Sequence, residues 1–171
     1  RKSFDQVQEM IELKGNPAKA IKKPWKYLKT AAVATKSLPK RLKGNPKRYG
    51  FEEVKISDLP QIHSWPMDGG AFITLPQVYS EDVEQPGVMQ SNLGMYRIQL
   101  AGNDYIKDEE IGLHYQIHRG IGVHQAKANA LGQPLKVSIF VGGPPAHTLS
   151  AVMPLPEGIS ELTFAGALGN R

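Results

Sequence analysis

Cysteine is absent from this chain of 171 residues. Its absence excludes disulfide bonds, thiolate metal ligands and cysteine nucleophiles. Long apolar runs are absent as well, since no stretch reaches the roughly 18 consecutive apolar residues that a transmembrane helix needs. The first residues also lack the apolar centre of a secretory signal peptide. These absences favour a cytoplasmic protein without a membrane span, and they leave association with a membrane surface open.

The chain also lacks common signatures of nucleophilic and nucleotide chemistry. No Ser/His/Asp constellation is evident, and no G-x-G-x-x-G segment follows a strand pattern. Gly142-Gly143-Pro144-Pro145 has the glycines of a phosphate loop without its lysine, so we predict a tight turn there. Three histidines belong to no recognisable pattern and are expected to be ordinary structural residues: His63, His124 and His147.

What is present is a globular composition, with 40% hydrophobic and 22% charged residues. The length suits one domain or a large part of one. Position 1 is not Met, and residues 169–171 follow an unfinished apolar segment. We therefore expect a fragment of a longer protein.

Charge is distributed unevenly along the chain. Residues 1–50 carry 14 Lys/Arg and 3 Asp/Glu, a net charge of +11, whereas residues 51–171 carry 7 and 13, a net charge of −6. A basic segment of this kind binds nucleic acid or an anionic membrane, or it is a solvated face that packs on an acidic segment. We favour the second interpretation, because the basic residues are spread through loops. We divide the chain into a basic helical or connector segment, 1–50, and a folded domain, 51–171.

Hydrophobic periodicity predicts short strands first and strand–helix units later. We expect strands at 51–56, 71–75, 77–79, 94–100, 111–118 and 135–141, and helices at 4–13, 122–131, 146–152 and 160–168. Strands 94–100, 111–118 and the buried 135–141 should share one sheet, with the first two antiparallel. Helix 122–131 should pack through Val123, Ala126, Ala130 and Leu131, and Ser160 should cap the last helix. The order indicates an α+β domain around a small barrel or an open sheet.

Polar side chains interrupt two of these strands. Asn92 and Arg97 flank an apolar run, and His114, Gln116 and His118 alternate with apolar residues, which would place all three on one strand face. Such a row is unfavourable in a protein interior unless it binds something. The following residues 119–122, Arg-Gly-Ile-Gly, supply a cation and bare backbone amides that suit a phosphate.

Four motifs occur in a fixed order: Asn-Leu-Gly-Met-Tyr-Arg (92–97), His-Arg-Gly (118–120), Met-Pro-Leu-Pro-Glu-Gly-Ile-Ser-Glu (153–161) and Phe-Ala-Gly-Ala-Leu (164–168). Together they resemble the UbiD family, decarboxylases that use prenylated flavin mononucleotide (FMN), and the match runs from about residue 42 to the end. The resemblance implies an α+β fold, namely a split β-barrel of the flavin-reductase-like type with flanking helices. It also implies that the family's N-terminal and later regions are not in this chain.

The resemblance implies a divalent metal, generally Mn²⁺, bound by Asn92, His118 and Glu161. Oxygen and imidazole donors suit such a metal, which can neutralise the flavin phosphate. Taken alone, these residues have simpler interpretations: a turn asparagine, a structural histidine and a first-turn carboxylate favoured by the helix dipole. In relatives, backbone carbonyls of the segment before Ala151 help to hold K⁺, and such ligands leave no signature in a sequence.

Arg97 matches the family arginine beside the flavin ring and the substrate carboxylate, which makes it the candidate catalytic residue. A guanidinium grips a carboxylate at two points and stays charged in a dry pocket. The residues that would line the cofactor are Met95, Tyr96, Arg97, His114, Tyr115, Gln116, Arg119, Gly120 and Met153. Asn92 and Arg97 are an odd number of residues apart, so a regular strand would place them on opposite faces. Either Gly94 marks a bulge or bend, or Asn92 precedes the strand.

For the full-length protein, the resemblance implies a prenylated-FMN-dependent carboxy-lyase acting on an aromatic or α,β-unsaturated acid, such as 3-polyprenyl-4-hydroxybenzoate in ubiquinone biosynthesis. A flavin prenyltransferase would supply the cofactor, and the full-length protein would be a homo-oligomer. Relatives also use acidic residues downstream of 164–168, so we expect this segment alone to be inactive. Two alternatives stay open: a non-catalytic flavin-binding or scaffold module of split-barrel fold, and a nucleic-acid binder that uses residues 1–50.

Overall fold

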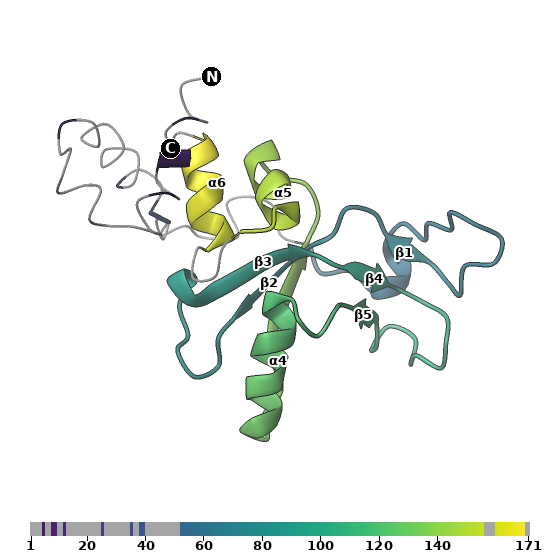
Figure 1. The fold of residues 1–171 in the computed structure, drawn as a ribbon. Coiled ribbons are helices and arrows are strands. Elements are labelled where there is room, and N and C mark those ends of the chain that lie inside the picture. Colours follow the sequence, from purple (N-terminus) through teal and green to yellow (C-terminus); the bar gives the residue numbers. More distant parts are fainter. Residues whose placement is uncertain are drawn as a thin grey trace.

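The structure is a computed structural model that describes residues 52–155 and 160–169, with Asp5, Gln8, Glu9, Glu12, Trp25, Thr35, Leu38 and Pro39 as isolated positions. Its elements are η2 (Ile56–Asp58), β1 (Phe72–Ile73), β2 (Gln77–Glu81), η3 (Val88–Gln90), β3 (Ser91–Met95), β4 (Arg97–Gln99), β5 (Gly112–His114), α4 (Gly120–Ala130), β6 (Val137–Phe140), α5 (Pro145–Val152) and α6 (Glu161–Gly169) (Figure 1). Asp5, Gln8, Glu9 and Glu12 are helical, as predicted for 4–13, and the rest of that prediction lies outside the described residues.

Two antiparallel three-stranded sheets form the centre of the described fold. One sheet has the order β1-β4-β5 and the other β3-β2-β6. The predicted mixture of helices with antiparallel sheets is confirmed, and so is the antiparallel pairing of the segments that became β4 and β5. The prediction of one sheet for 94–100, 111–118 and 135–141 is wrong, because β6 pairs with β2 in the other sheet.

The chain changes sheet at Tyr96, between β3 and β4. Gly94 permits this arrangement, since a Cβ there would overlap the ring of Tyr96, which folds back over β3. The break accounts for the odd spacing of Asn92 and Arg97, because the two residues belong to strands of different sheets. Asn92 lies within β3 and does not precede it.

Strand β5 is much shorter than predicted. It ends at His114, and the Arg119 N–H donates to the Gln116 carbonyl at 2.9 Å in a turn that leads directly into α4. The predicted strand 111–118 is therefore wrong beyond His114. His114, Gln116 and His118 do not form a row on one strand face, because Gln116 and His118 lie in the connection to the helix.

Helix α4 lies on one side of the β2–β3 pair, and α5 and α6 lie on the other (Figure 1). The predicted apolar face of α4 is wrong, since Val123 is 49% and Leu131 is 54% exposed. The helix instead buries Ile121, His124 and Ala128, which are spaced at three and four residues. The buried face thus follows helical periodicity but includes a histidine, which hydrophobicity alone does not select.

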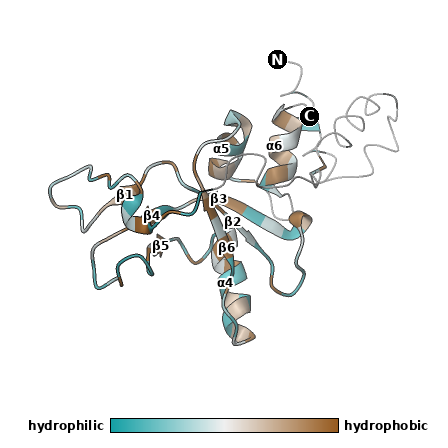
Figure 2. Ribbon diagram, turned by 180° about the vertical axis from the view of Figure 1, so that it is seen from behind, coloured by the Kyte–Doolittle hydropathy of each residue, from teal (hydrophilic) through white to brown (hydrophobic). Residues whose placement is uncertain are grey.

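The main core lies where the two sheets meet α4. Its buried members are Ala71, Val78, Ile98, Leu100 and Ile121. Burying a large aliphatic side chain of this kind stabilises a fold by about 1.5–3 kcal/mol. A second cluster, around Phe164 and Ala167, belongs to α6, whose hydrophobic residues are visible in Figure 2.

Two further strand predictions need correction. Residues 52–55 form no strand, because the Asp58 carboxylate accepts the Lys55 N–H at 3.1 Å and turns the chain into η2. Strand β6 is confirmed in position but is not buried, since it lies at a sheet edge with Val137 37% exposed.

The remaining loop and helix-start predictions agree only in part. The loop that follows β6 contains the expected glycine turn, in which Gly142 and Gly143 have φ of +83° and +97°. Ser160 directly precedes α6, but its hydroxyl donates to the Val88 carbonyl at 3.3 Å. No helix within the described part of the chain has the length and apolar character required to cross a bilayer.

Candidate functional site

A cavity of about 880 Å³ lies between β3, β4, the start of α4, the end of α5 and the start of α6. Every residue that the sequence predicted for the site lines this cavity: Asn92, Met95, Tyr96, Arg97, His114, Tyr115, Gln116, His118, Arg119, Gly120, Met153 and Glu161. These residues come from segments up to about 70 positions apart in the chain. The fold therefore collects the candidate metal, cofactor and substrate residues in one place.

Asn92 occupies the buried end of the cavity, where it is 8% exposed. Its Nδ2 donates to the hydroxyl of Tyr96 at 3.2 Å, which fixes the orientation of the amide. Its Oδ1 faces Gly120 so closely that a Cβ on that residue would overlap it. The amide oxygen is thus held at the start of α4, in a space that only glycine leaves open.

Glu161 approaches the same end from the first turn of α6. Its Oε2 accepts the N–H of Leu93, the neighbour of Asn92, at 3.1 Å. Burial raises the pKa of the Glu161 carboxyl, and the Leu93 hydrogen bond opposes that rise. A partly buried carboxylate of this kind is stabilised in its charged form by a cation placed beside it.

His118 lies in the turn before α4 and is exposed. Among the described residues, no group of three or more His, Cys, Asp or Glu side chains is arranged to hold a metal ion. A metal site in this cavity therefore requires the Asn92 amide oxygen together with the imidazole of His118 and the carboxylate of Glu161. One imidazole and two oxygen donors form a set that suits Mn²⁺.

The N-terminus of α4 opens onto the cavity through Arg119 and Gly120. The N-cap residue, Arg119, makes no side-chain hydrogen bond to this helix end. The Tyr96 hydroxyl receives the Ile121 N–H, and burial raises its pKa. A helix N-terminus beside an arginine, with first-turn N–H groups other than that of Ile121 still available, suits a phosphate group.

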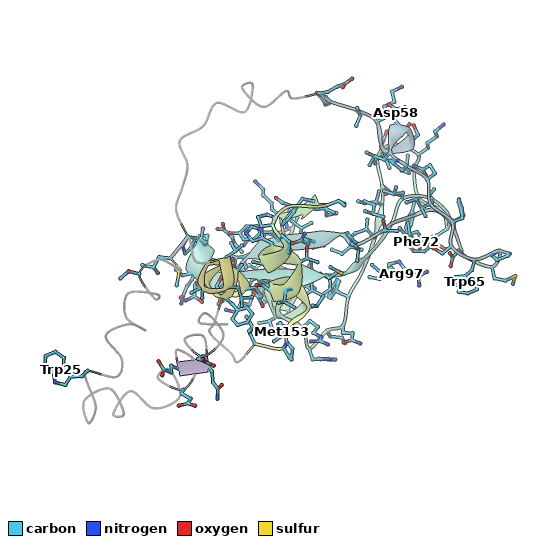
Figure 3. The ribbon with its side chains drawn as sticks, turned by 90° about the horizontal axis from the view of Figure 1, so that it is seen from above. Trp25, Asp58, Trp65, Phe72, Arg97 and Met153 are labelled. Atoms are coloured by element: carbon cyan, nitrogen blue, oxygen red, sulfur yellow. The ribbon has the colours of Figure 1, made fainter. Side chains whose placement is uncertain are left out.

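Arg97 occupies an exposed part of the cavity, its open end. It begins β4, pairs in register with His114 of β5 and has a side chain that is 57% exposed. Its guanidinium lies 4.0 Å from the ring centre of Phe72, and Figure 3 shows the two side by side. Its Nη2 lies 3.7 Å from Oδ1 of Asp68. The arginine is thus held at the rim of the cavity by a ring face and a carboxylate.

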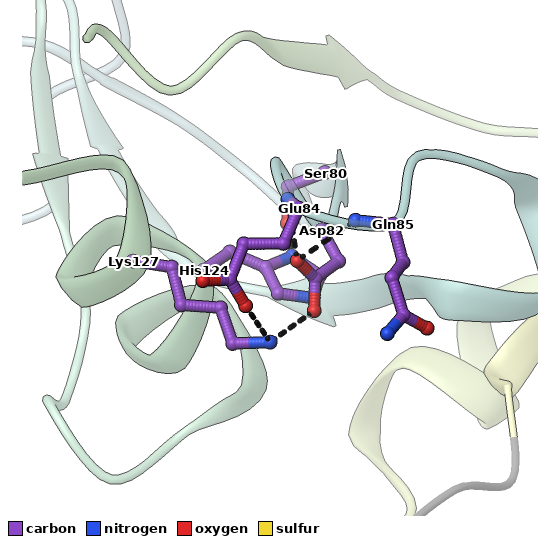
Figure 4. A network of polar contacts seen from close by, with 6 residues as sticks. All are labelled: Ser80, Asp82, Glu84, Gln85, His124 and Lys127. Atoms are coloured by element: carbon purple, nitrogen blue, oxygen red, sulfur yellow. Dashed lines mark hydrogen bonds and ion pairs between the residues drawn. The ribbon is translucent and has the colours of Figure 1, made fainter. Parts of the chain in front are cut away.

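The sequence did not single out several lining residues, of which His124 is the most informative. His124 is buried, its Nδ1 lies 2.9 Å from Oγ of Ser80, and burial lowers its pKa (Figure 4). The expectation of a structural histidine fits this environment, yet the residue also lines the cavity. The sequence signal that could have indicated the burial of His124 is its position three residues after Ile121, on the same face of the helix. Ser91 and Ser160 line the cavity too, with their hydroxyls 3.4 Å apart.

Comparisons with known proteins identify related sequences and structures. The sequence profile described as "UbiD: 3-octaprenyl-4-hydroxybenzoate carboxy-lyase Rift-related domain" matches residues 40–171, which is more than half of the chain. The chain belongs to the UbiD family. The resemblance carried by the four motifs is thereby confirmed.

UbiD relatives are similar in sequence over most of this chain. A Chlamydia pneumoniae protein, named as one of the subunits of 4-hydroxybenzoate decarboxylase, is 47% identical over 115 residues, 67% of this chain and 18% of that protein. An uncharacterized protein of Chlamydia trachomatis is 38% identical over 172 aligned positions, 99% of this chain and 28% of that protein. The chain thus spans less than a third of the length of these relatives.

Solved UbiD-type structures share the fold. The closed form of vanillic acid decarboxylase from Sedimentibacter hydroxybenzoicus has a TM-score of 0.59 and 31% identity, and the match covers 66% of this chain and 23% of that one. The apo structure of a 3,4-dihydroxybenzoic acid decarboxylase from Enterobacter cloacae has a TM-score of 0.53 and 30% identity over 66% of this chain and 22% of that one. The arrangement of helices and antiparallel sheets is therefore one that decarboxylases use.

Proposed function

We propose that the full-length protein containing this segment is a decarboxylase of an aromatic or α,β-unsaturated carboxylic acid that uses prenylated FMN. The observation that carries the proposal is the single cavity in which the N-terminus of α4, a set of oxygen and imidazole donors and Arg97 come together. Family membership and two relatives named as decarboxylases support the same activity. The split barrel of the flavin-reductase-like type is part of this proposal, with residues 51–171 as the flavin-binding domain and 1–50 as a connector.

The residues of the buried end fit the groups that this activity needs. Asn92, His118 and Glu161 would hold Mn²⁺, because all three line the cavity and together supply two oxygen donors and one imidazole nitrogen. Arg119 and the first N–H groups of α4 would hold the flavin phosphate. Backbone carbonyls before Ala151 are the candidates for K⁺. Five further residues line the cavity and would contact the flavin, namely Met95, Tyr96, Tyr115, Gln116 and Met153.

The chain's own residues account for binding and orientation of the acid. Arg97 presents a planar guanidinium that pairs with a carboxylate at two points and keeps its charge when water is excluded. His114, its cross-strand neighbour, is placed to contact the same group, since paired residues on neighbouring strands project to one face. Prenylated FMN, when bound, supplies the electron sink for loss of carbon dioxide.

The substrate proposed first is a 3-polyprenyl-4-hydroxybenzoate, which would place the protein in ubiquinone biosynthesis. The similar proteins are named for 4-hydroxybenzoate, vanillic acid and 3,4-dihydroxybenzoic acid, so simple hydroxybenzoates are the practical probes. A flavin prenyltransferase as cofactor supplier, a homo-oligomeric full-length protein and a cytoplasmic location complete the proposal.

The test is carbon dioxide release by the full-length protein after reconstitution with prenylated FMN and Mn²⁺. The acids to assay are 4-hydroxybenzoate, vanillate, 3,4-dihydroxybenzoate and a cinnamic acid, each with a matched sample that lacks the cofactor. We expect cofactor-dependent decarboxylation of at least one acid. Retention of the cofactor without turnover of any of them would favour a non-catalytic flavin module, and the absence of both would overturn the proposal.

A further inference from the structure

Asp68 faces Arg97 from the loop that precedes β1. Its Oδ1 lies 3.7 Å from Nη2 of Arg97, and its side chain is only 14% exposed, whereas that of Arg97 is 57% exposed. Asp68 and the ring of Phe72 are the partners of Arg97 among the residues that the structure describes. The carboxylate is thus the fixed member of the pair, and the guanidinium is the member that reaches into the cavity opening.

The two oxygens of Asp68 have different partners. Oδ2 accepts the N–H groups of Ser64 and Trp65, at 3.1 Å and 3.0 Å, while Oδ1 faces Arg97. The N–H of Asp68 also donates to the Trp65 carbonyl at 3.1 Å. The hydrogen bonds to Oδ2 therefore hold the Asp68 side chain against its own loop. They also fix the direction in which Oδ1 faces Arg97.

The loop is fixed to the strand that carries Arg97. Gly70 lies so close to Ala101, and Gly102 so close to Gly69, that a Cβ on Gly70 or Gly102 would overlap the opposing carbonyl. The buried Gln99 donates through Nε2 to the carbonyls of Gly69 and Ala101, at 3.2 Å and 3.0 Å. Gln99 is two residues after Arg97 in β4. The loop that contains Asp68 is therefore attached to the same strand that carries Arg97.

We propose that Asp68 is a positioning residue for Arg97 in the decarboxylation reaction, an inference that rests on the proposed function. A separation of 3.7 Å is too long for a hydrogen bond, so the carboxylate attracts the guanidinium without consuming its N–H donors. The ring of Phe72 supports the guanidinium from its face. The donors stay available for the two oxygens of the substrate carboxylate, and the arginine is already in place when the acid arrives.

The decisive variant in the full-length protein is Asp68→Asn. Asparagine keeps an oxygen that accepts the Ser64 and Trp65 amides, but it removes the charge beside Arg97. Asp108→Asn is the matched control, because Asp108 also accepts a backbone amide, that of Ser57 at 2.7 Å, in a different loop. We expect Asp68→Asn to lower kcat about ten-fold without raising KM, since misplacement of a binding group affects the reacting geometry. Asp108→Asn should change neither constant.

A second variant separates the effect of the Phe72 ring on Arg97 from the effect of the Asp68 carboxylate. Phe72→Leu keeps an apolar side chain in β1 but removes the ring face beneath the guanidinium. The expected loss of kcat is about two- to five-fold, the size of a cation–π contact at an exposed site. A loss as large as that of Arg97→Ala would assign the positioning to Phe72 and overturn the role of Asp68.

Crystal structures of the cofactor-free full-length variants supply a readout that does not depend on activity. We expect Arg97 in one conformer in the wild type and in several conformers in Asp68→Asn, with the loop 64–70 unchanged. A single Arg97 conformer in Asp68→Asn would overturn the proposal, and so would a raised KM accompanied by a lower melting temperature, which indicates a purely structural role. Failure of the wild type to decarboxylate any acid would reject the proposed function and leave the conformer test intact.

Discussion

The two ends of the cavity differ in how the protein holds their functional side chains. At the buried end, Asn92 is 8% exposed and is oriented by the Tyr96 hydroxyl, and the Glu161 carboxylate is tied to the Leu93 N–H. At the open end, the Arg97 side chain is 57% exposed and has an ion pair of 3.7 Å and the ring of Phe72 as its partners. The first end is built by direct hydrogen bonds, and the second by longer contacts.

This difference follows from what each end is expected to bind. Oxygen donors for a metal must converge before the ion arrives, and hydrogen bonds from neighbouring groups achieve this. A guanidinium that meets a carboxylate must keep its donors free, and it stays charged in either environment. Substitutions at the buried end should therefore change metal retention and stability, whereas substitutions at the open end should change turnover in a folded protein.

The largest expected effect is at the open end. In the full-length protein, Arg97→Ala should reduce decarboxylation by about 10²–10³-fold, because a preorganised charge is removed from the site. Arg97→Lys should be nearly as impaired, since an ammonium does not reproduce a planar two-point grip. The measurement is turnover of a hydroxybenzoic or cinnamic-type acid, with circular dichroism to establish folding. Turnover close to that of the wild type in Arg97→Ala would remove this residue from the mechanism.

At the buried end, Tyr96→Phe should weaken metal binding while sparing the fold. The variant removes the hydroxyl that orients Asn92, and loss of such a supporting hydrogen bond costs about 10–100-fold in metal affinity. Tyr105→Phe is a close control, because the Tyr105 hydroxyl also accepts an asparagine Nδ2 at 3.2 Å, from Asn103 in an exposed loop. Mn²⁺ affinity is measured by calorimetry on the full-length protein. Equal affinities for the two variants would show that Tyr96 does not support the metal site.

Gly94→Ala tests whether the break between the sheets depends on the Tyr96 ring. The added methyl group would overlap that ring, and overpacking of this kind costs about 1–3 kcal/mol. We expect a lower melting temperature together with weaker Mn²⁺ binding. Gly169→Ala is the control, since a Cβ there meets no atom within 4 Å. A stable Gly94→Ala variant with normal metal affinity would mean that the ring is free to move.

The smallest expected effect is a change in stability and comes from a contact outside both ends of the cavity. This contact is the ion pair between Lys127 and Asp82 (Figure 4). The hydrogen bond from Lys127 lowers the pKa of Asp82, and the same bond raises the pKa of Lys127. The contribution of Asp82 to stability is thus present above the ordinary pKa of an aspartate and is lost as the pH falls through the lowered value. The contribution of Lys127 is present below its ordinary pKa and is lost as the pH rises through the raised value.

Asp82→Asn should therefore lower the melting temperature at neutral pH, and its difference from the wild type should shrink as the solution is acidified below about pH 4. Turnover and Mn²⁺ affinity should not change. Glu84→Gln, which alters the more exposed partner of Lys127 at 3.1 Å, should have a smaller effect. A constant difference between Asp82→Asn and the wild type at every pH would contradict the ionic origin of the stabilisation.

The sequence predicted residues that line one cavity, but it predicted the strands that carry them less well. Asn92, His118 and Glu161 were selected by motif order and line one cavity, although their strand and helix contexts were only partly right. Period-two alternation predicted a strand through His118, but a turn at Gln116 ends β5 and begins α4. The alternation of polar and apolar residues does not predict such a turn, because the hydrogen bond that closes it joins backbone groups common to nearly all residues.

Tertiary contacts explain the other differences. The break at Tyr96 depends on a ring folded over Gly94, and the burial of His124 depends on Ser80 from a strand 44 positions earlier. Asp68 gave no signal in the sequence, because its role follows from the close approach of Gly70 and Gly102 to opposing carbonyls. Pairings between distant segments of this kind are not contained in the periodicity of either segment.

The most direct test of the account is a crystal structure of the full-length protein reconstituted with prenylated FMN and Mn²⁺, with anomalous scattering to locate the metal. We expect one manganese ion coordinated by Asn92, His118 and Glu161, with the flavin phosphate at the start of α4 and the flavin ring extending toward Arg97. Manganese bound by other residues, or a flavin seated outside this cavity, would contradict it.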